Sequence, residues 1–261
     1  MNRPVVSAAF VACALLVMNG CGSSSSSETR ADGSAQSSGD AAACGDPSLA
    51  AVDPTALIDD MEAPDSATAM GAARGGGWWA GGDDPSKAAG ASITPDGVVS
   101  AEKIPGGRCG SVYANHVTGQ GFGTWAIMNV SFGWGSVDGG EGAQLPYDAS
   151  FRTGITFWAR VGDTSSADVS VKISDKYSND AGGICDKSVA SGSTSCYDHF
   201  GAPLTKLSTT WQQYKVPFRG LSQEGFGIPR DSLDTSSLYD VEFMLPRGTT
   251  FDLWVDDISF Y

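Results

Sequence analysis

Basic residues, histidines and long apolar runs are all scarce in this chain. Its 16 lysines and arginines are outnumbered by 30 aspartates and glutamates, which gives a formal net charge of −14. Because a nucleic-acid backbone repels a surface of this sign, nucleic acid is not an expected partner. The acidic residues are scattered through turns, so they indicate a solvated extracellular surface that carries, at most, a few calcium sites.

The longest apolar run, residues 5–18, is shorter than the ~20 residues that a membrane-spanning helix needs. It follows Arg3 and precedes a small residue, Cys21 and a serine tract, an order typical of a secretory signal that ends at a lipid-attachment cysteine. This segment resembles that of bacterial lipoproteins, so we expect residues 1–20 to be a signal peptide and Cys21 to be lipidated. A plain secretory signal is the alternative.

The resemblance to lipoproteins also implies a location. Gly22 lacks the aspartate that retains many such proteins at the inner membrane, so we expect an exported protein whose lipid anchors it at the outer membrane or cell surface. From Gly22 to about Ala43 the chain has no large apolar residue and cannot form a core. The expected order is a signal peptide (1–20), a lipidated Ser/Gly-rich tether (21–50) and one domain (51–261).

The cysteines contain no CxxC pair, and only two histidines accompany them, which disfavours zinc. The signal and the lipid site account for two of the six cysteines. An even four in an exported chain predicts two disulfides. Cys185 and Cys196 flank a Gly/Ser-rich segment, which favours a bridge between them and leaves Cys44 to pair with Cys109.

Helical periodicity is nearly absent, whereas short alternating or β-branched and aromatic runs recur between Gly, Asp, Asn and Pro. In residues 155–161 and 169–173 every second residue is apolar, so each of these strands buries one side. The predicted strands are 56–62, 76–80, 98–104, 111–117, 124–132, 154–161, 168–174, 211–218, 238–245 and 250–261. This pattern predicts an all-β fold, an antiparallel β-sandwich of the jelly-roll type, with a closed barrel as the alternative.

The last predicted strand changes the parity of its apolar residues. Phe251, Leu253 and Val255 occupy odd-numbered positions, whereas Ile258 and Phe260 occupy even-numbered ones. The switch falls at Asp256 and Asp257. A β-bulge would produce this switch, and so would a strand that is covered on both faces.

Four segments together resemble galactose-binding-like jelly-roll modules, and most closely the carbohydrate-binding modules of the family 11 kind. The segments are Ile58-Asp59-Asp60-Met61-Glu62, Gly76-Gly77-Trp78-Trp79, Gly154-Ile155-Thr156-Phe157-Trp158-Ala159 and Phe251-Asp252-Leu253-Trp254-Val255-Asp256-Asp257-Ile258. Their order and spacing carry the resemblance, which spans about residues 56–261.

The resemblance implies a structural calcium ion between the first and last strands. Ca²⁺ takes six to eight oxygen ligands and cancels the repulsion between acids on neighbouring strands. The expected ligands are Asp60, Glu62 and Asp256, with Asp59 and Asp257 as further candidates. Alternatively, these acids are solvated edge residues that limit aggregation.

The resemblance further implies a sugar-binding cleft on the concave sheet, because pyranose faces pack on aromatic rings while their hydroxyls need polar partners. The expected ligand-binding residues are Trp78, Trp79, Tyr197, Asp198 and His199. The last three follow Cys196, whose disulfide would hold their loop rigid. In the alternative interpretation, Asp198 and His199 only satisfy backbone groups.

Further aromatic and basic residues fall into two sets. Trp125, Trp134, Tyr113, Tyr177 and Arg160 are additional candidates for the cleft. Trp158 and Trp254 are expected to be structural, because each lies in a strand whose alternate residues are regularly apolar and is itself on the other face of that strand.

Three functions remain open at this stage. The first is a non-catalytic lipoprotein of the cell envelope that binds a polysaccharide or glycan. The second is a structural or adhesion protein that recognises another protein. The third is a glycoside hydrolase that uses a carboxylate pair. A serine or cysteine triad is unsupported, because no nucleophile motif accompanies His116 or His199.

Overall fold

The structure is a computed structural model that describes residues 55–68, 75–83, 90–136 and 142–261. These residues all belong to one unit, residues 36–261. The predicted signal peptide, the tether with Cys21, and Cys44 lie outside the described residues. No described segment forms a helix that is long and apolar enough to cross a membrane.

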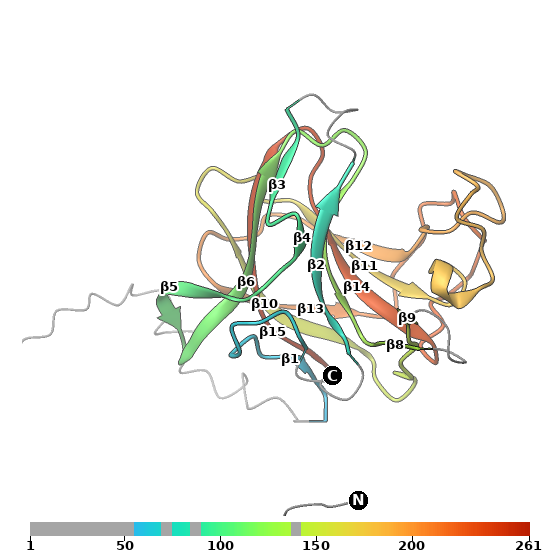
Figure 1. The fold of residues 1–261 in the computed structure, drawn as a ribbon, viewed down its shortest axis with the longest axis horizontal. Helices are drawn as coiled ribbons and strands as arrows, with labels where there is room; N and C mark the ends of the chain where they lie inside the picture. Colours follow the sequence, from blue (N-terminus) through green and yellow to red (C-terminus); the bar gives the residue numbers. More distant parts are fainter. Residues whose placement is uncertain (1–54, 69–74, 84–89, 137–141) are drawn as a thin grey trace, which may run out of the picture. The chain divides into compact units, whose positions relative to one another are not determined.

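Two antiparallel sheets pack face to face (Figure 1), which confirms the predicted all-β jelly-roll sandwich. The first sheet has the order β13 (Gln212–Pro217), β10 (Gly154–Val161), β15 (Thr250–Phe260), β6 (Ser111–Gln120) and β3 (Ser92–Thr94), with β1 (Leu57–Asp59) beside β15 and β5 (Glu102–Arg108) beside β6. The second sheet has the order β12 (Phe200–Leu204), β11 (Val169–Asp175), β14 (Leu238–Met244), β7 (Ala126–Ser131), β2 (Gly77–Gly82) and β4 (Gly97–Val98). A short hairpin of β8 (Trp134–Ser136) and β9 (Gly142–Gln144) and the 3-10 turn η3 (Asp180–Gly182) complete the described elements.

The main core lies between the two sheets. Phe157 of β10 meets Phe243 of β14 edge to face, with ring centroids 5.0 Å apart. Trp78 stacks on the same Phe243 ring at 6.3 Å. Burying each such side chain contributes on the order of 2–3 kcal/mol, so these contacts join the sheets firmly.

The outer face of the first sheet carries a second buried cluster, in which Trp158, Trp211 and Trp254 pack together. The guanidinium of Arg108 lies 4.7 Å from the Trp158 ring centroid, and that of Arg160 lies 4.8 Å from the Trp254 ring centroid. Cation–π contacts of this kind are strong where water is excluded. The structural role expected for Trp158 and Trp254 is therefore confirmed.

The parity switch in β15 has both of its proposed causes. The register between β10 and β15 shifts between Thr156 and Trp158, and Asp257 has a φ of 48°, as a β-bulge requires. On the outer side, the tryptophan cluster covers the strand as well. The bulge places Asp256 and Asp257 next to Arg108, whose guanidinium binds both carboxylates.

Candidate functional site

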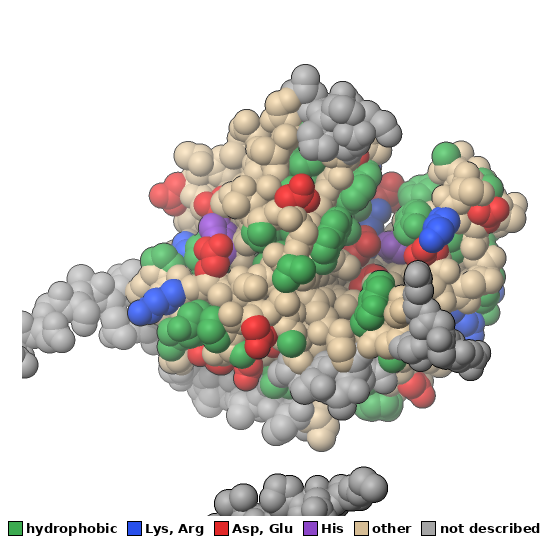
Figure 2. Space-filling model, viewed as in Figure 1, with side chains coloured by type: hydrophobic (Ala, Val, Ile, Leu, Met, Phe, Trp, Pro, Cys, Tyr) green, Lys and Arg blue, Asp and Glu red, His purple; other side chains and the backbone are tan. Residues whose placement is uncertain are grey.

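A cleft of about 630 Å³ opens on the outer face of the second sheet. Figure 2 shows it as a hollow between the body of the sandwich and a lobe at the right, with a histidine and charged side chains inside it. Its aromatic lining consists of Trp79, Trp125, Tyr197 and Phe226. The remaining lining residues are Thr124, Ile127, Lys172, His199, Glu224, Glu242, Met244 and Arg247. A volume of this size is typical of small-molecule sites.

The floor of the cleft is built by strand register. Trp79, Asn129, Glu242 and Lys172 lie directly opposite one another across β2, β7, β14 and β11. Their sequence neighbours point into the core, so this row points outward. The adjacent row, Gly81–Ile127–Met244, is apolar. The floor therefore changes from a row that carries Glu242 and Lys172 to an apolar row over two residues along the strands.

Trp79 lies along its own strand at one side of the cleft and is 40% exposed. A Cβ added to Gly81 would lie 2.0 Å from the Trp79 ring, so the ring occupies the space above this glycine. The absence of a side chain at Gly81 thus allows the indole to lie flat on the sheet with one face open.

Trp125 is held at the rim by Asp83. The Asp83 carboxylate accepts hydrogen bonds from the backbone N–H groups of Thr124 (2.5 Å) and Trp125 (2.9 Å). The Asp83 N–H in turn donates to the Trp125 carbonyl at 2.9 Å. These bonds fix the backbone that carries a half-exposed ring, which is what a preorganised binding residue needs.

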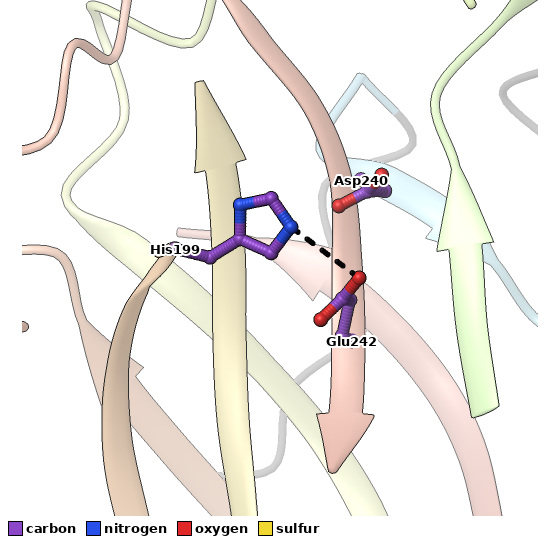
Figure 3. A group of neighbouring side chains, drawn as sticks. All are labelled: His199, Asp240 and Glu242. Carbon is purple, nitrogen blue, oxygen red and sulfur yellow. Dashed lines mark ion pairs between the residues drawn. The ribbon is translucent and has the colours of Figure 1, made fainter. Parts of the chain in front are cut away.

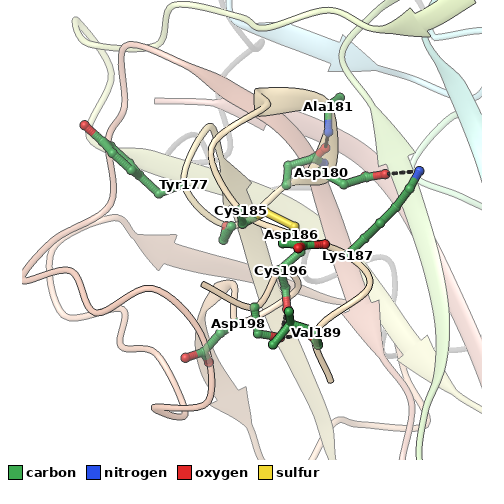
Figure 4. Close-up of a disulfide and its surroundings, with 12 residues drawn as sticks. Tyr177, Asp180, Ala181, Cys185, Asp186, Lys187, Val189, Cys196 and Asp198 are labelled. Atoms are coloured by element: carbon green, nitrogen blue, oxygen red, sulfur yellow. Dashed lines mark hydrogen bonds and ion pairs between the residues drawn. A yellow bond between two sulfur atoms is a disulfide. The ribbon is translucent and has the colours of Figure 1, made fainter. Parts of the chain in front are cut away.

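The lobe beside the cleft comprises residues 177–197. It is braced by the predicted disulfide between Cys185 and Cys196, whose Cα atoms lie 5.0 Å apart (Figure 4). Lys187 also pairs with Asp180 at 3.1 Å within this lobe. Cys109 is disulfide-bonded as well, but its predicted partner Cys44 lies outside the described residues.

Tyr197 projects from this lobe into the cleft and is half exposed. Its φ of 71° is rare for a residue with a large side chain and costs on the order of 1 kcal/mol or more. Its N–H donates to the Ser178 carbonyl at 2.7 Å, which helps to hold this conformation. Strained residues of this kind cluster at binding sites.

Asp198 does not reach the cleft, which corrects the expectation that it binds ligand. It is 1% exposed, and its carboxylate accepts hydrogen bonds from the N–H groups of Glu224 (2.8 Å), Gly225 (2.9 Å) and Gly227 (2.9 Å). These bonds shape the loop that brings Glu224 and Phe226 to the cleft. The alternative in which Asp198 satisfies backbone groups is the one that the structure shows.

Trp78 requires the same correction. It is 2% exposed and belongs to the core between the sheets. Successive residues of a strand face opposite sides, so Trp78 and Trp79 cannot both line one cleft.

His199 lies at the floor, where Nδ1 is 2.9 Å from Ser178 Oγ and Nε2 is 3.5 Å from Glu242 Oε1 (Figure 3). Burial disfavours the charged imidazole, but the charge and hydrogen bond of Glu242 outweigh it and raise the pKa of His199. Burial and the nearby Glu242 charge raise the pKa of Asp240 to about 6. The floor thus brings together titratable groups that are largely buried.

Lys172 links the floor to the loop that Asp198 shapes, because its ammonium group lies 2.7 Å from Glu224. Neither Lys172 nor Glu242 was predicted as a site residue. A signal was present in residues 238–244, where Asp240 and Glu242 alternate with the apolar Val241 and Phe243.

The acids predicted to bind calcium accept hydrogen bonds from other groups, and Arg108 gives a countercharge to one of them, Asp256. Asp256 accepts hydrogen bonds from Arg108 Nε at 2.8 Å and from Ser111 Oγ at 2.7 Å. Ser111 Oγ is also 2.7 Å from Glu62, so its single hydroxyl hydrogen is available to either carboxylate. Glu62 also accepts the Val112 N–H at 2.9 Å, and Asp60 accepts the Glu62 N–H at 3.2 Å. Arg108 supplies a countercharge to Asp256 and Asp257, whereas Asp60 and Glu62 accept hydrogen bonds from neutral groups. Calcium at this position stays a prediction.

Comparison with known proteins finds no matching family model and no matching curated protein. Among solved structures, the chain is similar to the family 11 carbohydrate-binding module of the cellulosomal cellulase Lic26A-Cel5E of Clostridium thermocellum (14% identity, TM-score 0.46, covering 78% of this chain and 92% of the module). A family 11 module from Clostridium thermocellum in complex with a β-1,3-1,4-mixed-linked tetrasaccharide gives 17% identity and a TM-score of 0.45 over 78% of this chain and 94% of the module. The family 30 module of the cellulosomal cellulase Cel9D-Cel44B of Clostridium thermocellum gives 15% identity and 0.44 over 70% and 90%. The group that the sequence resembles is thus among the structures to which this chain is similar.

Proposed function

We propose that the cleft binds a polysaccharide or glycan without cleaving it. The observation that carries this proposal is the placement of three exposed rings, Trp79, Trp125 and Tyr197, around one open cleft with a polar floor. The C–H faces of a pyranose pack on such rings, while Lys172 and Glu242 lie where sugar hydroxyls need hydrogen-bond partners.

The burial of Asp240 favours binding over hydrolysis. A glycosidase needs two carboxyl groups that both reach the scissile bond. Glu242 and Glu224 both line the cleft, but Glu224 pairs with Lys172 at 2.7 Å. Asp240 is buried below the cleft and accepts hydrogen bonds from Ser174 (2.5 Å), Asn179 (3.1 Å) and Gln144 (3.2 Å). A carboxyl group held in this way is not available to protonate a glycosidic oxygen.

We further propose that the protein displays this cleft at the cell envelope through a lipid on Cys21. This step rests on the sequence of residues 1–22 alone. Mass spectrometry of the N-terminal peptide from the membrane fraction tests it. Acylated Cys21 is the expected result, and release of the Cys21→Ser variant from membranes is the expected consequence.

A glycan array with the purified protein tests the binding function, followed by retention on a soluble β-glucan gel. Trp79→Ala should abolish retention. Trp134→Ala is the matched control, because Trp134 is also an exposed tryptophan but does not line the cleft. A folded wild-type protein that retains no glycan would overturn the proposal and favour recognition of another protein. Equal losses in both variants would show that the cleft is not the binding surface.

A further inference from the structure

Three side chains converge at the floor of the cleft from β14 and from the residue before β12, a strand that is not adjacent to β14 in the sheet. His199 precedes β12, whereas Asp240 and Glu242 project from β14 (Figure 3). One donor atom of each residue lies within 4.8 Å of the others. Imidazole nitrogen and carboxylate oxygen are ligands that Zn²⁺ and related ions accept.

The distance between His199 and Glu242 is longer than that of a short charge-assisted hydrogen bond. Charge-assisted hydrogen bonds between nitrogen and oxygen span about 2.7–2.9 Å, whereas Nε2 and Oε1 are 3.5 Å apart. Two ligands bound at about 2.1 Å to a tetrahedral ion lie roughly 3.4 Å from each other. The Nε2–Oε1 separation is therefore also compatible with two ligands of one tetrahedral ion, and the three donor atoms together lie within 4.8 Å of one another.

The groups behind these side chains hold them in the orientation that a ligand set requires. Ser178 Oγ is 2.9 Å from His199 Nδ1 and already accepts the Asp175 N–H at 3.2 Å. In the tautomer that binds a metal ion through Nε2, the proton is on Nδ1 and can be donated to Ser178 Oγ. Asp240 is fixed by Ser174, Asn179 and Gln144, and carboxylates that bind metal are usually supported in this manner.

The charge balance also favours a cation. Within the part of the chain that the structure describes, neither Asp240 nor Glu242 forms an ion pair with a lysine or arginine. Lys172, which neighbours Glu242 across the strands, pairs with Glu224 instead. In the described structure His199 is the one group with which either acid forms an ion pair, and a divalent cation would neutralise both carboxylates.

We propose that His199 Nε2, Asp240 and Glu242 bind a divalent first-row transition-metal ion of the Zn²⁺ class. His199 and Glu242 line the cleft, so the fourth position of the ion would face the cleft and take water or a ligand hydroxyl. This site needs neither cysteine nor CxxC spacing, and it is separate from the all-oxygen calcium site predicted at Asp60, Glu62 and Asp256. It does not depend on whether the cleft binds a sugar.

Calorimetric titration of the chelator-washed protein with ZnCl₂ tests the proposal, with a purification tag that contains no histidines. We expect saturable binding of one equivalent and a higher unfolding midpoint in the presence of Zn²⁺. His199→Gln and Glu242→Gln should each weaken Zn²⁺ binding by about tenfold or more. Ca²⁺, which prefers oxygen ligands, should bind no more weakly to His199→Gln than to the wild type.

His116→Gln is the matched control. His116 also lies between two acids, Glu102 at 3.2 Å and Asp252 at 2.9 Å, but each of its ring nitrogens meets a different carboxylate. Its donor atoms do not converge on one point, so Zn²⁺ affinity should be unchanged in this variant. The proposal is overturned by an absence of saturable Zn²⁺ binding, by wild-type affinity in both His199→Gln and Glu242→Gln, or by an equal loss in His116→Gln. Circular dichroism shows which variants are folded. If His199→Gln does not fold, the Zn²⁺ affinity of Glu242→Gln decides the proposal.

Discussion

The indole nitrogen of Trp78 donates a hydrogen bond to the buried carboxylate of Asp59 at 2.7 Å. This bond ties β2 of the second sheet to β1 of the first, across the core. The next residue, Trp79, faces the opposite side of β2 and lines the cleft. The two adjacent tryptophans therefore have different roles, which substitution can separate.

Trp78→Ala should destabilise the fold, because it removes a core ring and leaves Asp59 without its indole donor. We expect the free energy of unfolding to fall by about 3–5 kcal/mol. Trp79→Ala, which removes a partly exposed ring, should cost less than about 1.5 kcal/mol and abolish glycan retention. Urea denaturation of both variants measures the difference. Equal destabilisation would mean that Trp79 is also a core residue.

Gly81→Ala should displace the Trp79 ring, because the new Cβ would occupy the position of the indole. The ring is the movable end of a side chain, so the strand should persist while glycan affinity falls about tenfold or more. Gly123→Ala is the control, since the nearest atom to its added Cβ is 3.8 Å away. Tryptophan fluorescence and β-glucan retention report the two effects. Unchanged retention in Gly81→Ala would show that the orientation of Trp79 does not matter.

Asp198→Ala should loosen the loop at residues 224–227. The variant loses the acceptor for three backbone N–H groups, those of Glu224, Gly225 and Gly227. Hydrogen–deuterium exchange should accelerate at these amides, and glycan affinity should fall because Glu224 and Phe226 are no longer held at the cleft. Exchange in β10, far from this loop, serves as the internal reference. Unchanged protection at residues 224–227 would refute this role.

Arg108→Met should destabilise the first sheet, because Asp256 is fully buried and would lose its countercharge. Breaking a buried pair on one side costs about 3–5 kcal/mol. Adding Asp256→Asn to Arg108→Met should recover part of this loss, since no unpaired charge then remains in the interior. A double variant no more stable than Arg108→Met would mean that the ion pair is not the cause.

Calcium binding at Asp60, Glu62 and Asp256 is tested separately by chelation. If the ion is present, excess EGTA should lower the unfolding midpoint of the wild type. The same treatment should have a smaller effect on Glu62→Gln, which removes one expected ligand. If EGTA leaves the midpoint unchanged, no calcium stabilises this site, and Arg108 and Ser111 are the groups that hold the acids in place.

Alternation along single strands is what the sequence reveals best. Residues 154–161 were predicted with the bounds that β10 has, because every second residue there is apolar. The strand β12 was not predicted, since Gly201 and Pro203 weaken its pattern. An edge strand tolerates both residues, and β12 lies at the edge of its sheet.

The cleft was less accessible to prediction, because its floor joins residues that are distant in sequence. Lys172 and Glu242 become neighbours only through the pairing of β11 with β14. Tyr197 and Trp79 were predicted from residue type, and the cleft brings them together. Asp198 has the same polar character as a ligand-binding residue, and only its three backbone partners reveal that it supports a loop.

Removal of the disulfide in a Cys185→Ser/Cys196→Ser variant should affect both stability and binding. The bridge closes a loop of sequence separation 11, for which the chain-entropy model gives a stabilisation of about 3 kcal/mol. Cys196 directly precedes Tyr197, whose positive φ needs surrounding structure to hold it. We therefore expect glycan affinity to fall more in this variant than in Tyr177→Ala, which removes an aromatic ring from the same lobe that does not line the cleft. Chemical denaturation and gel retention measure the two effects, and full affinity without the bridge would show that Tyr197 keeps its position unaided.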